Sequence, residues 1–405
     1  MALWIQTKRA SRRFGQTTGP LVILWSLVTA TTVSAQPNWL SGYVQTVPLL
    51  SGPTQSSPAS VSDFNRLRLS LEPSWGPVSL EAAYEHAITI SQHGTQSGFL
   101  GAVPNGGEWL PLDNTVVDQD HVQWGQRLDR LNVRFSPSQS LDLTIGRQAV
   151  SWGTTLFLTP ADPFLPFNPA DPFRQFRGGV DVARLQMYPG PLSTVDVVVR
   201  ATNSPLGEEV TALGRGLTTW QNWELSAWGG TLYGDTAGAV GISGSLGTWA
   251  LRAEGVVREL RGRIIGRGAL GLDRVLQIAD RDLFLIFEYQ RDGLAAAAPA
   301  RYTELLLTPE FLRGELQTLG RDVTVAQASY QVSPLWNLAG LSMWNMNDNS
   351  TLVAPSVTYT AGDETTISGG IYFGFGDAHI TASQPLPSEF GLASSTGYLS
   401  LSVFF

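Results

Sequence analysis

Apolar and polar positions alternate with a period of two along most of the chain. Within residues 249–258, Leu251 and Val257 fall on one face, and Arg252 and Glu254 fall on the other. Successive side chains of a β-strand point to opposite sides of the sheet, so the pattern predicts strands with one apolar and one polar face. Segments of about ten residues with this pattern are typical of transmembrane β-barrels, although strands of a soluble β-sandwich alternate as well.

The connections between these segments favour the barrel. Tight turns rich in Pro, Gly and Ser alternate with long polar stretches, as short periplasmic turns and long extracellular loops do in outer-membrane barrels. The tight turns lie at 73–77, 136–138, 189–191, 333–335 and 361–364, and the long stretches lie near 91–120, 153–179, 203–222, 291–320 and 376–393. Aromatic residues beside tight turns fit a girdle at the membrane interface. These residues are Trp75, Phe135, Tyr188 and Trp336.

We predict an all-β fold, a transmembrane antiparallel up-and-down β-barrel of about 16 strands within a range of about 14 to 18. The candidate strands are 39–49, 61–72, 78–90, 121–135, 141–152, 180–188, 192–202, 223–233, 236–246, 249–258, 267–277, 283–290, 321–332, 336–346, 351–360, 365–375 and 394–405. A single-chain bacterial barrel has an even number of strands, and this set is odd. Glycines blur the pattern in 223–246: if 223–233 belongs to a long loop, 16 strands remain, and if another strand is undetected, the count is 18.

The first 35 residues read as an export signal, and residues 36–405 as the barrel. A basic region that includes Arg12 and Arg13 precedes a short apolar run from Leu21 to Val28. The run is too short to span a bilayer, and small residues that end at Ala35 provide a cleavage site. We therefore expect export to the bacterial outer membrane, with the signal peptide cleaved near Ala35.

The C-terminal segment is the most specific feature of the pattern. In GYLSLSVFF, residues 397–405, Leu401, Val403 and Phe405 lie on one face and the chain ends on an aromatic residue. This segment resembles the terminal strand of Gram-negative outer-membrane barrels. The resemblance implies that these three residues form an assembly signal read by the barrel-assembly machinery.

Composition and charge narrow the remaining possibilities. Only 15% of residues are charged and Cys is absent, which excludes disulfide scaffolds, thiolate metal sites and cysteine nucleophiles. The formal net charge is −8; loss of residues 1–35 removes four basic residues and leaves 22 arginines against 34 acidic residues, or −12. Such a chain lacks the basic face that a nucleic acid requires. The expected partners are outer-membrane lipid and lipopolysaccharide, the barrel-assembly machinery and small polar solutes.

The polar half of each predicted strand would line the interior of the barrel. Opposite charges across a pore create a transverse field that tunes which solutes pass. An alternative is that the inward charges pair with one another and only brace the wall. The predicted lumen-wall residues are Arg66, Arg68, Glu81, Glu85, Arg134, Asp142, Arg184, Arg200, Arg252 and Glu254.

The stretch 153–179 is the most unusual connection. It repeats the motif Pro-Ala-Asp-Pro-Phe at 160–164 and 169–173, and its prolines keep it out of the strand ladder. Five phenylalanines are costly to expose to water, so we expect the stretch to fold into the barrel as a constriction; an outer lid packed on other loops is the alternative. The predicted constriction residues are Asp162, Phe164, Asp171, Phe173, Arg174 and Arg177.

Catalytic and metal-binding patterns are weak. Gly266-x-Gly268-x-x-Gly271 has the spacing of a dinucleotide fingerprint but no surrounding strand–helix–strand pattern. The four histidines, His86, His93, His121 and His379, are scattered without metal-ligand spacing. We expect no catalytic residues, no cofactor and no metal, and keep an outer-membrane hydrolase with a Ser–His–Asp set drawn from separate loops as a minor alternative.

The region from Gly146-Arg147-Gln148 through the two Pro-Ala-Asp-Pro-Phe repeats to Gly179-Val180-Asp181 resembles a group of outer-membrane porins that includes alginate-export-like barrels. That resemblance implies a channel for a polar solute, with anionic solutes among the candidates. It does not identify the substrate. The sequence thus predicts a porin-like channel for passive or facilitated diffusion of small polar solutes. The alternative is a barrel plugged by its own loops that serves as an assembly partner or adhesin. Whether the barrel is a monomer or a trimer is left open by the sequence.

Overall fold

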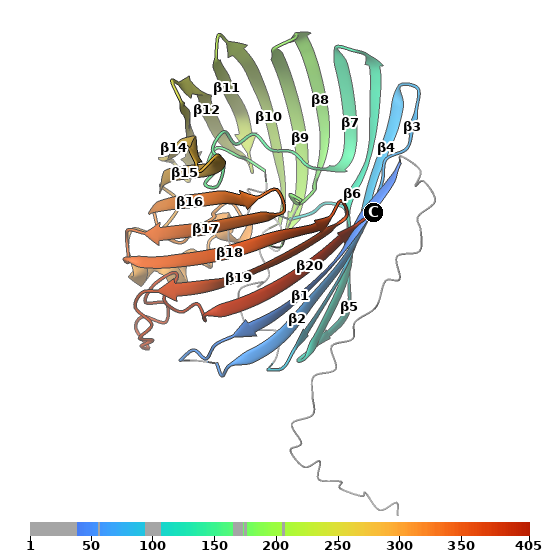
Figure 1. The fold of residues 1–405 in the computed structure, drawn as a ribbon. Coiled ribbons are helices and arrows are strands. Elements are labelled where there is room, and N and C mark those ends of the chain that lie inside the picture. The colour runs from blue at the N-terminus through green and yellow to red at the C-terminus, as the bar shows by residue number, and fades with distance from the viewer. Residues whose placement is uncertain (1–38, 56, 94–106, 165–172, 174–175, 205–206) are drawn as a thin grey trace, which may run out of the picture. The chain divides into compact units, whose positions relative to one another are not determined.

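The computed structural model describes residues 39–405, except 56, 94–106, 165–172, 174–175 and 205–206. Within these residues, 18 antiparallel strands form one closed ring (Figure 1). The strands of the ring are β1 Leu40–Ser51, β2 Ser60–Leu71, β4 Val78–Ser91, β6 Val122–Ser138, β7 Leu141–Gln148, β8 Val180–Gly190, β9 Ser193–Ser204, β10 Gly207–Trp220, β11 Trp223–Leu232, β12 Asp235–Leu246, β13 Trp249–Leu260, β14 Arg263–Ile278, β15 Arg281–Asp292, β16 Asp322–Ser333, β17 Trp336–Asn345, β18 Ser350–Gly362, β19 Thr365–Phe375 and β20 Thr396–Phe404. The expected signal peptide and its cleavage site near Ala35 lie outside the described residues.

Two short strands and three short helices complete the fold. Strand β3, Ser74–Trp75, pairs with β4, and strand β5, Asp113–Gln119, pairs with the N-terminal part of β6, from Val122 to Arg127. The helices η2 Pro299–Arg301, α1 Tyr302–Leu305 and α2 Pro309–Leu312 follow β15. No helix in the described part of the chain is both long and apolar enough to cross a membrane.

The ring closes where the first strand pairs with the last. Tyr43 pairs with Phe404, and the pairing runs on to Ser51 and Thr396. Two backbone bonds, between Gly42 and Phe405, extend the seam by a further pair at 2.8 and 3.0 Å. A Cβ on Gly42 would lie 2.7 Å from the Phe405 ring, so glycine is needed for this close approach. Pairing all the way round satisfies the strand backbones without water, as a bilayer demands.

The two faces of the wall differ as the alternation predicts. On β13, Val257 points outward and is 55% exposed, whereas its neighbours Val256 and Arg258 are buried inside. The outer face carries other exposed apolar side chains, such as Ile264 and Leu270. An apolar exterior around a polar, partly charged interior is the arrangement of a transmembrane barrel.

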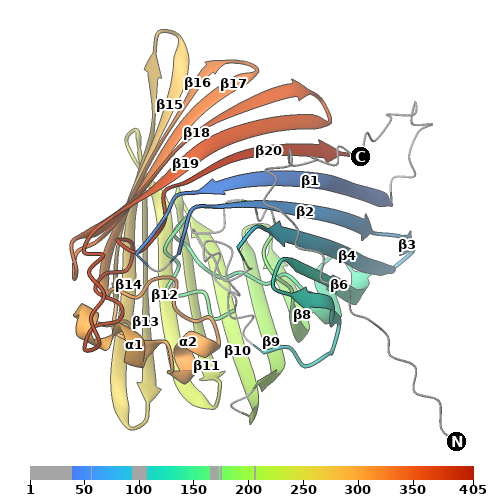
Figure 2. The same cartoon turned by 90° about the horizontal axis from the view of Figure 1, so that it is seen from below.

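The connections are short at one end of the barrel, which we call the turn end, and uneven at the other, the loop end. The two-residue turn 279–280 joins β14 to β15 at the turn end, with positive φ at both Ala279 and Asp280. Such a turn matches the twist of antiparallel strands. At the loop end, two-residue turns join β11 to β12 and β13 to β14, whereas 149–179, 293–321 and 376–395 are long. Figure 2 shows α1 and α2 near the ends of β11–β14.

One predicted loop is wrong. The stretch 203–222 contains β10, and 223–232 is strand β11 rather than part of a loop, so the ring has 18 strands instead of 16. Strand β10 escapes the pattern because its outward face carries Gly214 and Gly216, while Leu213 is buried on the inner face. Although Val210 and Trp220 are exposed on the outward face, the glycines between them weaken the alternation along this strand.

Candidate functional site

Residues 149–179, which we call the inner segment, leave the wall after β7 and rejoin it at β8. Leu158 packs against Val323 of β16. Phe173 packs against Val47 of β1, and Trp152 belongs to a cluster with residues of β9, β10 and β11. These strands lie on different sides of the ring, and one segment can touch all of them only from within. The described part of the inner segment therefore lies inside the barrel.

An aromatic contact fixes the start of the inner segment. Trp152 is 1% exposed and meets Phe164 edge to face, with ring centroids 5.0 Å apart. Trp228 of β11 lies 6.4 Å from Trp152 and donates its indole N–H to the carbonyl of Ala161 at 2.9 Å. The rings thus fill the space between the segment and the wall, where exposure to water would be costly.

Two wall carboxylates hold the backbone of the inner segment. Glu254 of β13 accepts the amide N–H groups of Thr154, Thr155 and Ala161 at 2.5, 3.2 and 2.8 Å. Glu288 of β15 accepts those of residues 156, 157 and 158 at 2.6, 2.9 and 2.9 Å. Hydrogen bonds to a charged group contribute about 1.5–3 kcal/mol each, more than neutral ones. Glu254 is a predicted lumen-wall residue, and in the structure it anchors this segment.

The segment 293–321 meets the inner segment from the loop end. The side-chain amide of Gln317 accepts the N–H of Thr159 and donates to the carbonyl of Phe157, both at 2.7 Å. Arg258 of β13 donates to Glu315 at 2.5 Å, and Arg313 pairs with Glu209 of β10. Two long connections are therefore joined to each other and to the wall across the interior.

The structure describes four of the six predicted constriction residues; Asp171 and Arg174 lie outside the described residues. Asp162 is buried and pairs with Arg177 at 2.6 Å, and it also accepts the hydroxyl of Ser151 at 2.9 Å. Burial raises the pKa of Asp162, and the positive charge of Arg177 opposes that rise. Phe164 and Phe173 are buried too, and Arg177 keeps a quarter of its side chain exposed.

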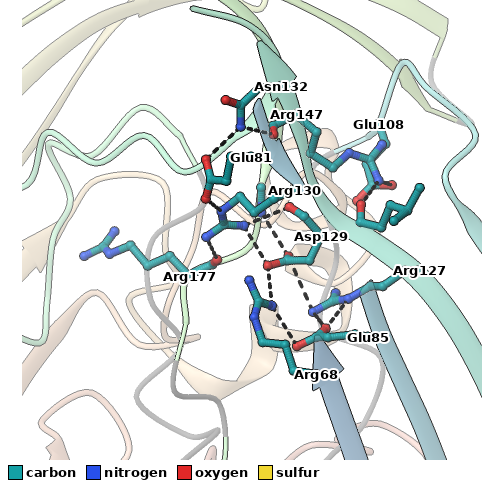
Figure 3. Close-up of polar contacts among 12 residues, drawn as sticks. Arg68, Glu81, Glu85, Glu108, Arg127, Asp129, Arg130, Asn132, Arg147 and Arg177 are labelled. Carbon is teal, nitrogen blue, oxygen red and sulfur yellow. Dashed lines mark hydrogen bonds and ion pairs between the residues drawn. The ribbon is translucent and has the colours of Figure 1, made fainter. Parts of the chain in front are cut away.

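A network of arginines and carboxylates spans β2, β4 and β6 (Figure 3). Arg68 contacts Asp129 at 2.8 Å and Glu85 at 3.3 Å, and Arg130 contacts the same Asp129 oxygen at 2.7 Å. Arg127 also binds Glu85. Arg68, Glu85, Asp129 and Arg130 are each at most 5% exposed. The predicted wall residues Arg68 and Glu85 thus meet as partners in one buried ion network.

The inner segment lies against this network. Arg66 donates to the carbonyl of Phe173 at 2.9 Å, and Arg130 donates to that of Arg177 at 2.7 Å. The guanidinium of Arg68 lies over the Phe176 ring at 4.5 Å. The arginines of this network thus balance the wall carboxylates and also bind the C-terminal part of the inner segment.

Most of the other predicted wall residues also have partners. The pairs are Arg184 with Asp196 at 3.0 Å, Arg252 with Asp273 at 3.0 Å, Arg130 with Glu81 at 3.5 Å, Tyr188 with Asp142 at 3.2 Å and Arg200 with Tyr233 at 2.9 Å. Arg134 is exposed near the turn end, on the same face of β6 as the buried Asn132. These paired side chains stabilise the wall, and they also make the inner face of the barrel polar.

Sequence reasoning missed a buried ion pair on the outward side of β7 and β8. Arg147 contacts Asp181 at 2.8 Å and Glu108 at 2.8 Å, and it is 1% exposed. Asp181 accepts the N–H groups of Trp109 and Leu110, both at 2.8 Å. The segment 107–112 thus covers charges that would otherwise face outward beside two short strands. Arg147 lies in the triplet 146–148 and Asp181 in the triplet 179–181, at the two ends of the inner segment. Only the register of β7 and β8 brings the two residues together.

The described residues contain no group of three His, Asp or Glu side chains that could hold a metal ion. His86 instead lies among aromatic side chains of β4 and β6, with its Nδ1 3.2 Å from the Tyr84 hydroxyl and 3.4 Å from the Trp124 indole nitrogen. What the described interior offers is a polar, charged wall and a segment pinned to it by Glu254 and Glu288.

Known proteins resemble the chain in fold rather than in sequence. No known family profile matches it, and no curated protein matches it in sequence. Among solved structures, OpdQ of Pseudomonas aeruginosa shares 9% identity and a TM-score of 0.53, over 91% of this chain and 98% of that chain. A BenF-like porin from Pseudomonas fluorescens Pf-5 shares 11% and 0.52, over 91% and 98%. Pseudomonas aeruginosa OpdK, in a structure with vanillate, shares 10% and 0.52, over 90% and 98%. The chain has the fold of these outer-membrane porins.

Proposed function

We propose that the chain is a porin-like channel of the bacterial outer membrane for passive or facilitated diffusion of small polar solutes. The observation that carries this proposal is the inner segment, which is held inside an 18-strand barrel by Glu254 and Glu288. A segment pinned across a polar interior narrows a channel and leaves the strand pairing of the barrel wall intact. Selectivity would then come from the width at this segment and from the charges around it.

Small anions are the favoured solute class. Arg66, which forms no ion pair within the described residues, places a guanidinium beside the returning half of the inner segment, whereas Asp129 and Glu85 balance the charges of Arg68 and Arg130. Guanidinium groups bind carboxylates in two-point geometry. Vanillate, an aromatic carboxylate, is present in the structure of OpdK, and a compound of that kind is a reasonable first candidate here. Kinship with the alginate-export-like group stays a prediction.

The remaining sequence predictions belong to the same proposal. We infer that residues 1–35 direct export and are removed near Ala35, that Leu401, Val403 and Phe405 act as the assembly signal, and that the outer face contacts lipid and lipopolysaccharide. The exposed side chains of Leu399 and Ile371 on the outer wall support contact with lipid. Catalysis is not part of the proposal.

Single-channel recording in planar bilayers tests the proposal. The purified full chain should give discrete conductance steps, and reversal potentials in a salt gradient should indicate preference for anions. Liposome swelling with a size series of sugars and carboxylates would then report the solute class. Absence of steps from folded, inserted protein would contradict the channel.

A plugged barrel that serves as an assembly partner or adhesin is the second candidate. It is favoured by one observation: the inner segment packs on β1, β11 and β16, so it touches several sides of the interior. The same recordings separate the two, because a plugged barrel inserts without conducting.

A further inference from the structure

Three connections at the loop end meet at two carboxylates. Asp348 lies in the turn 346–349, and Glu389 lies in the segment 376–395. The third connection, 293–321, supplies Tyr302 of α1 and the backbone of Leu319 and Gly320. We call this cluster the loop-end clasp.

Glu389 binds the segment 293–321 directly. Its carboxylate accepts the amide N–H of Leu319 at 2.7 Å and that of Gly320 at 3.1 Å. It also accepts the side-chain amide of Asn345, on β17, at 2.7 Å. The backbone of 319–320 is therefore fixed to 376–395 through one side chain.

Asp348 completes the clasp. It accepts the hydroxyl of Tyr302 at 2.8 Å and the backbone N–H of Glu389 at 2.8 Å. It also accepts the amide nitrogen of Asn345 at 3.1 Å and the backbone N–H of Ser350 at 2.8 Å. Tyr302, Asn345 and Ser350 are completely buried, and Asp348 is half-buried, so these bonds are partly shielded from water.

The two carboxylates share one donor, the side-chain amide of Asn345. The amide nitrogen of Asn345 carries two hydrogens but lies within 3.1 Å of three oxygens, on Tyr302, Asp348 and Glu389. Every donor named is neutral, and two carboxylates that share a donor favour retention of one proton between them. The titratable groups that face Glu389 are Asp348 and Tyr302.

The electrostatics agree with this geometry. Burial, together with the charge of Asp348, raises the pKa of Glu389 to about 7, although the backbone N–H groups of Leu319 and Gly320 oppose the rise. Burial and the neighbouring Asp348 also raise the pKa of Tyr302, so its hydroxyl stays protonated as a donor.

We propose that Asp348 and Glu389 form a proton-operated clasp, which ties the three loop-end connections together while the pair holds a proton and releases them when both carboxylates are ionised. A glutamate freed from the clasp would return to an ordinary pKa near 4.5. The proton therefore stabilises the clasped form fully below that pH, and the stabilisation is lost as pH rises through about 7. The ratio of clasped to released form should fall on the order of a hundredfold across this range.

A spin label tests the clasp without any need for conduction. The chain has no Cys, so S383C places a single label on an exposed site of 376–395. In the folded full chain, the label should become more mobile between about pH 5 and about pH 8.5. Adding E389Q, which keeps the acceptor for Leu319 but carries no charge, should hold the label in its low-pH state at both pH values.

The matched control is E304Q in the same segment as Tyr302, where Glu304 is 70% exposed; it should leave the pH response unchanged. Folding of each variant is checked by heat-dependent gel mobility, and D348N replaces E389Q if the latter fails to fold. A label with equal mobility at both pH values, or a response that survives in E389Q and D348N, would overturn the clasp.

A conductance arm of the test rests on the proposed channel function. There the frequency of gating events should rise with pH in the unmodified chain and stay flat in E389Q. A barrel that never conducts would contradict the channel, whereas the mobility of the label would still support or overturn the clasp by itself.

Discussion

The interior wall uses its charges in two ways on its two sides. Along β2, β4 and β6, carboxylates such as Asp129 and Glu85 face arginines, and the charges cancel within the wall. Along β13 and β15, Glu254 and Glu288 instead accept backbone N–H groups of the inner segment. The same residue types therefore brace the barrel on one side and position a loop on the other.

A charged interior is therefore not by itself a selectivity filter. An ion pair within the wall leaves little net field for a solute, whereas Glu254 and Glu288 are bound by neutral amides and form no ion pair within the described residues. Both kinds of carboxylate occupy inward-facing positions in the alternating pattern of their strands. Only the partner distinguishes a brace from an anchor.

Loss of Asp129 should have the largest effect. Asp129→Ala leaves Arg68 and Arg130 buried without their shared partner, which should destabilise the barrel by about 3–5 kcal/mol. Urea unfolding in detergent, followed by tryptophan fluorescence, measures the change. Asp363→Ala in the exposed β18–β19 turn is the control, and equal stability of the two variants would break the distinction between braced and exposed carboxylates.

Removal of an anchor should change the channel more than the fold. Glu288→Ala deletes three hydrogen bonds to residues 156–158 and should free that part of the inner segment. We expect roughly a doubling of single-channel conductance and faster swelling with larger solutes, because the constriction widens. Glu224→Ala, at an exposed position of β11, is the matched control. Unchanged conductance in Glu288→Ala would show that this carboxylate positions nothing that limits flow.

The predicted constriction set gives a smaller effect, on selectivity. Replacement of Asp162, Asp171, Arg174 and Arg177 by Ala removes two negative and two positive groups, including the Asp162–Arg177 pair, so the local field should change and ion preference with it, although the net charge stays the same. Reversal potentials in a tenfold salt gradient measure that preference. Such a gradient corresponds to a free-energy difference of about 1.4 kcal/mol for each ion. If the reversal potentials match those of the unmodified chain, these residues do not form the constriction.

The smallest effect is expected at an exposed pair outside both regions. Arg301 and Glu304 are 3.4 Å apart and about two-thirds exposed, so Arg301→Ala should change stability by less than about 0.5 kcal/mol. The same urea experiment sets this variant against Asp129→Ala. A large loss here would mean that the exposed loop segment, rather than the buried network, controls stability.

Much of the fold could be predicted from the chain alone. The period of two located most strands, and the alternating C-terminal segment predicted the strand that pairs with β1. Strand β10 was missed because Gly214 and Gly216 occupy its outward face and Leu213 its inward face. Alternation between apolar and polar residues cannot detect a strand whose outward positions include glycines and whose inward positions include leucine.

The candidate site was predicted less completely. Composition and proline content identified the inner segment, but Glu254 was expected only as a wall charge and Gln317 was not singled out. Their hydrogen bonds join residues about 100 and 160 positions apart. The pairing of Arg147 with Asp181 likewise depends on the register of two strands separated by the whole inner segment.

The alternating pattern of the chain established which faces of the strands point outward and which point to the interior, because side-chain direction alternates along a strand whatever lies around it. The sequence also determined that the stretch 153–179 needs shelter from water. The tertiary structure decided the strand number, the partner of each interior charge and the path of the inner segment. These depend on ring closure and on contacts between distant residues, which local patterns do not encode.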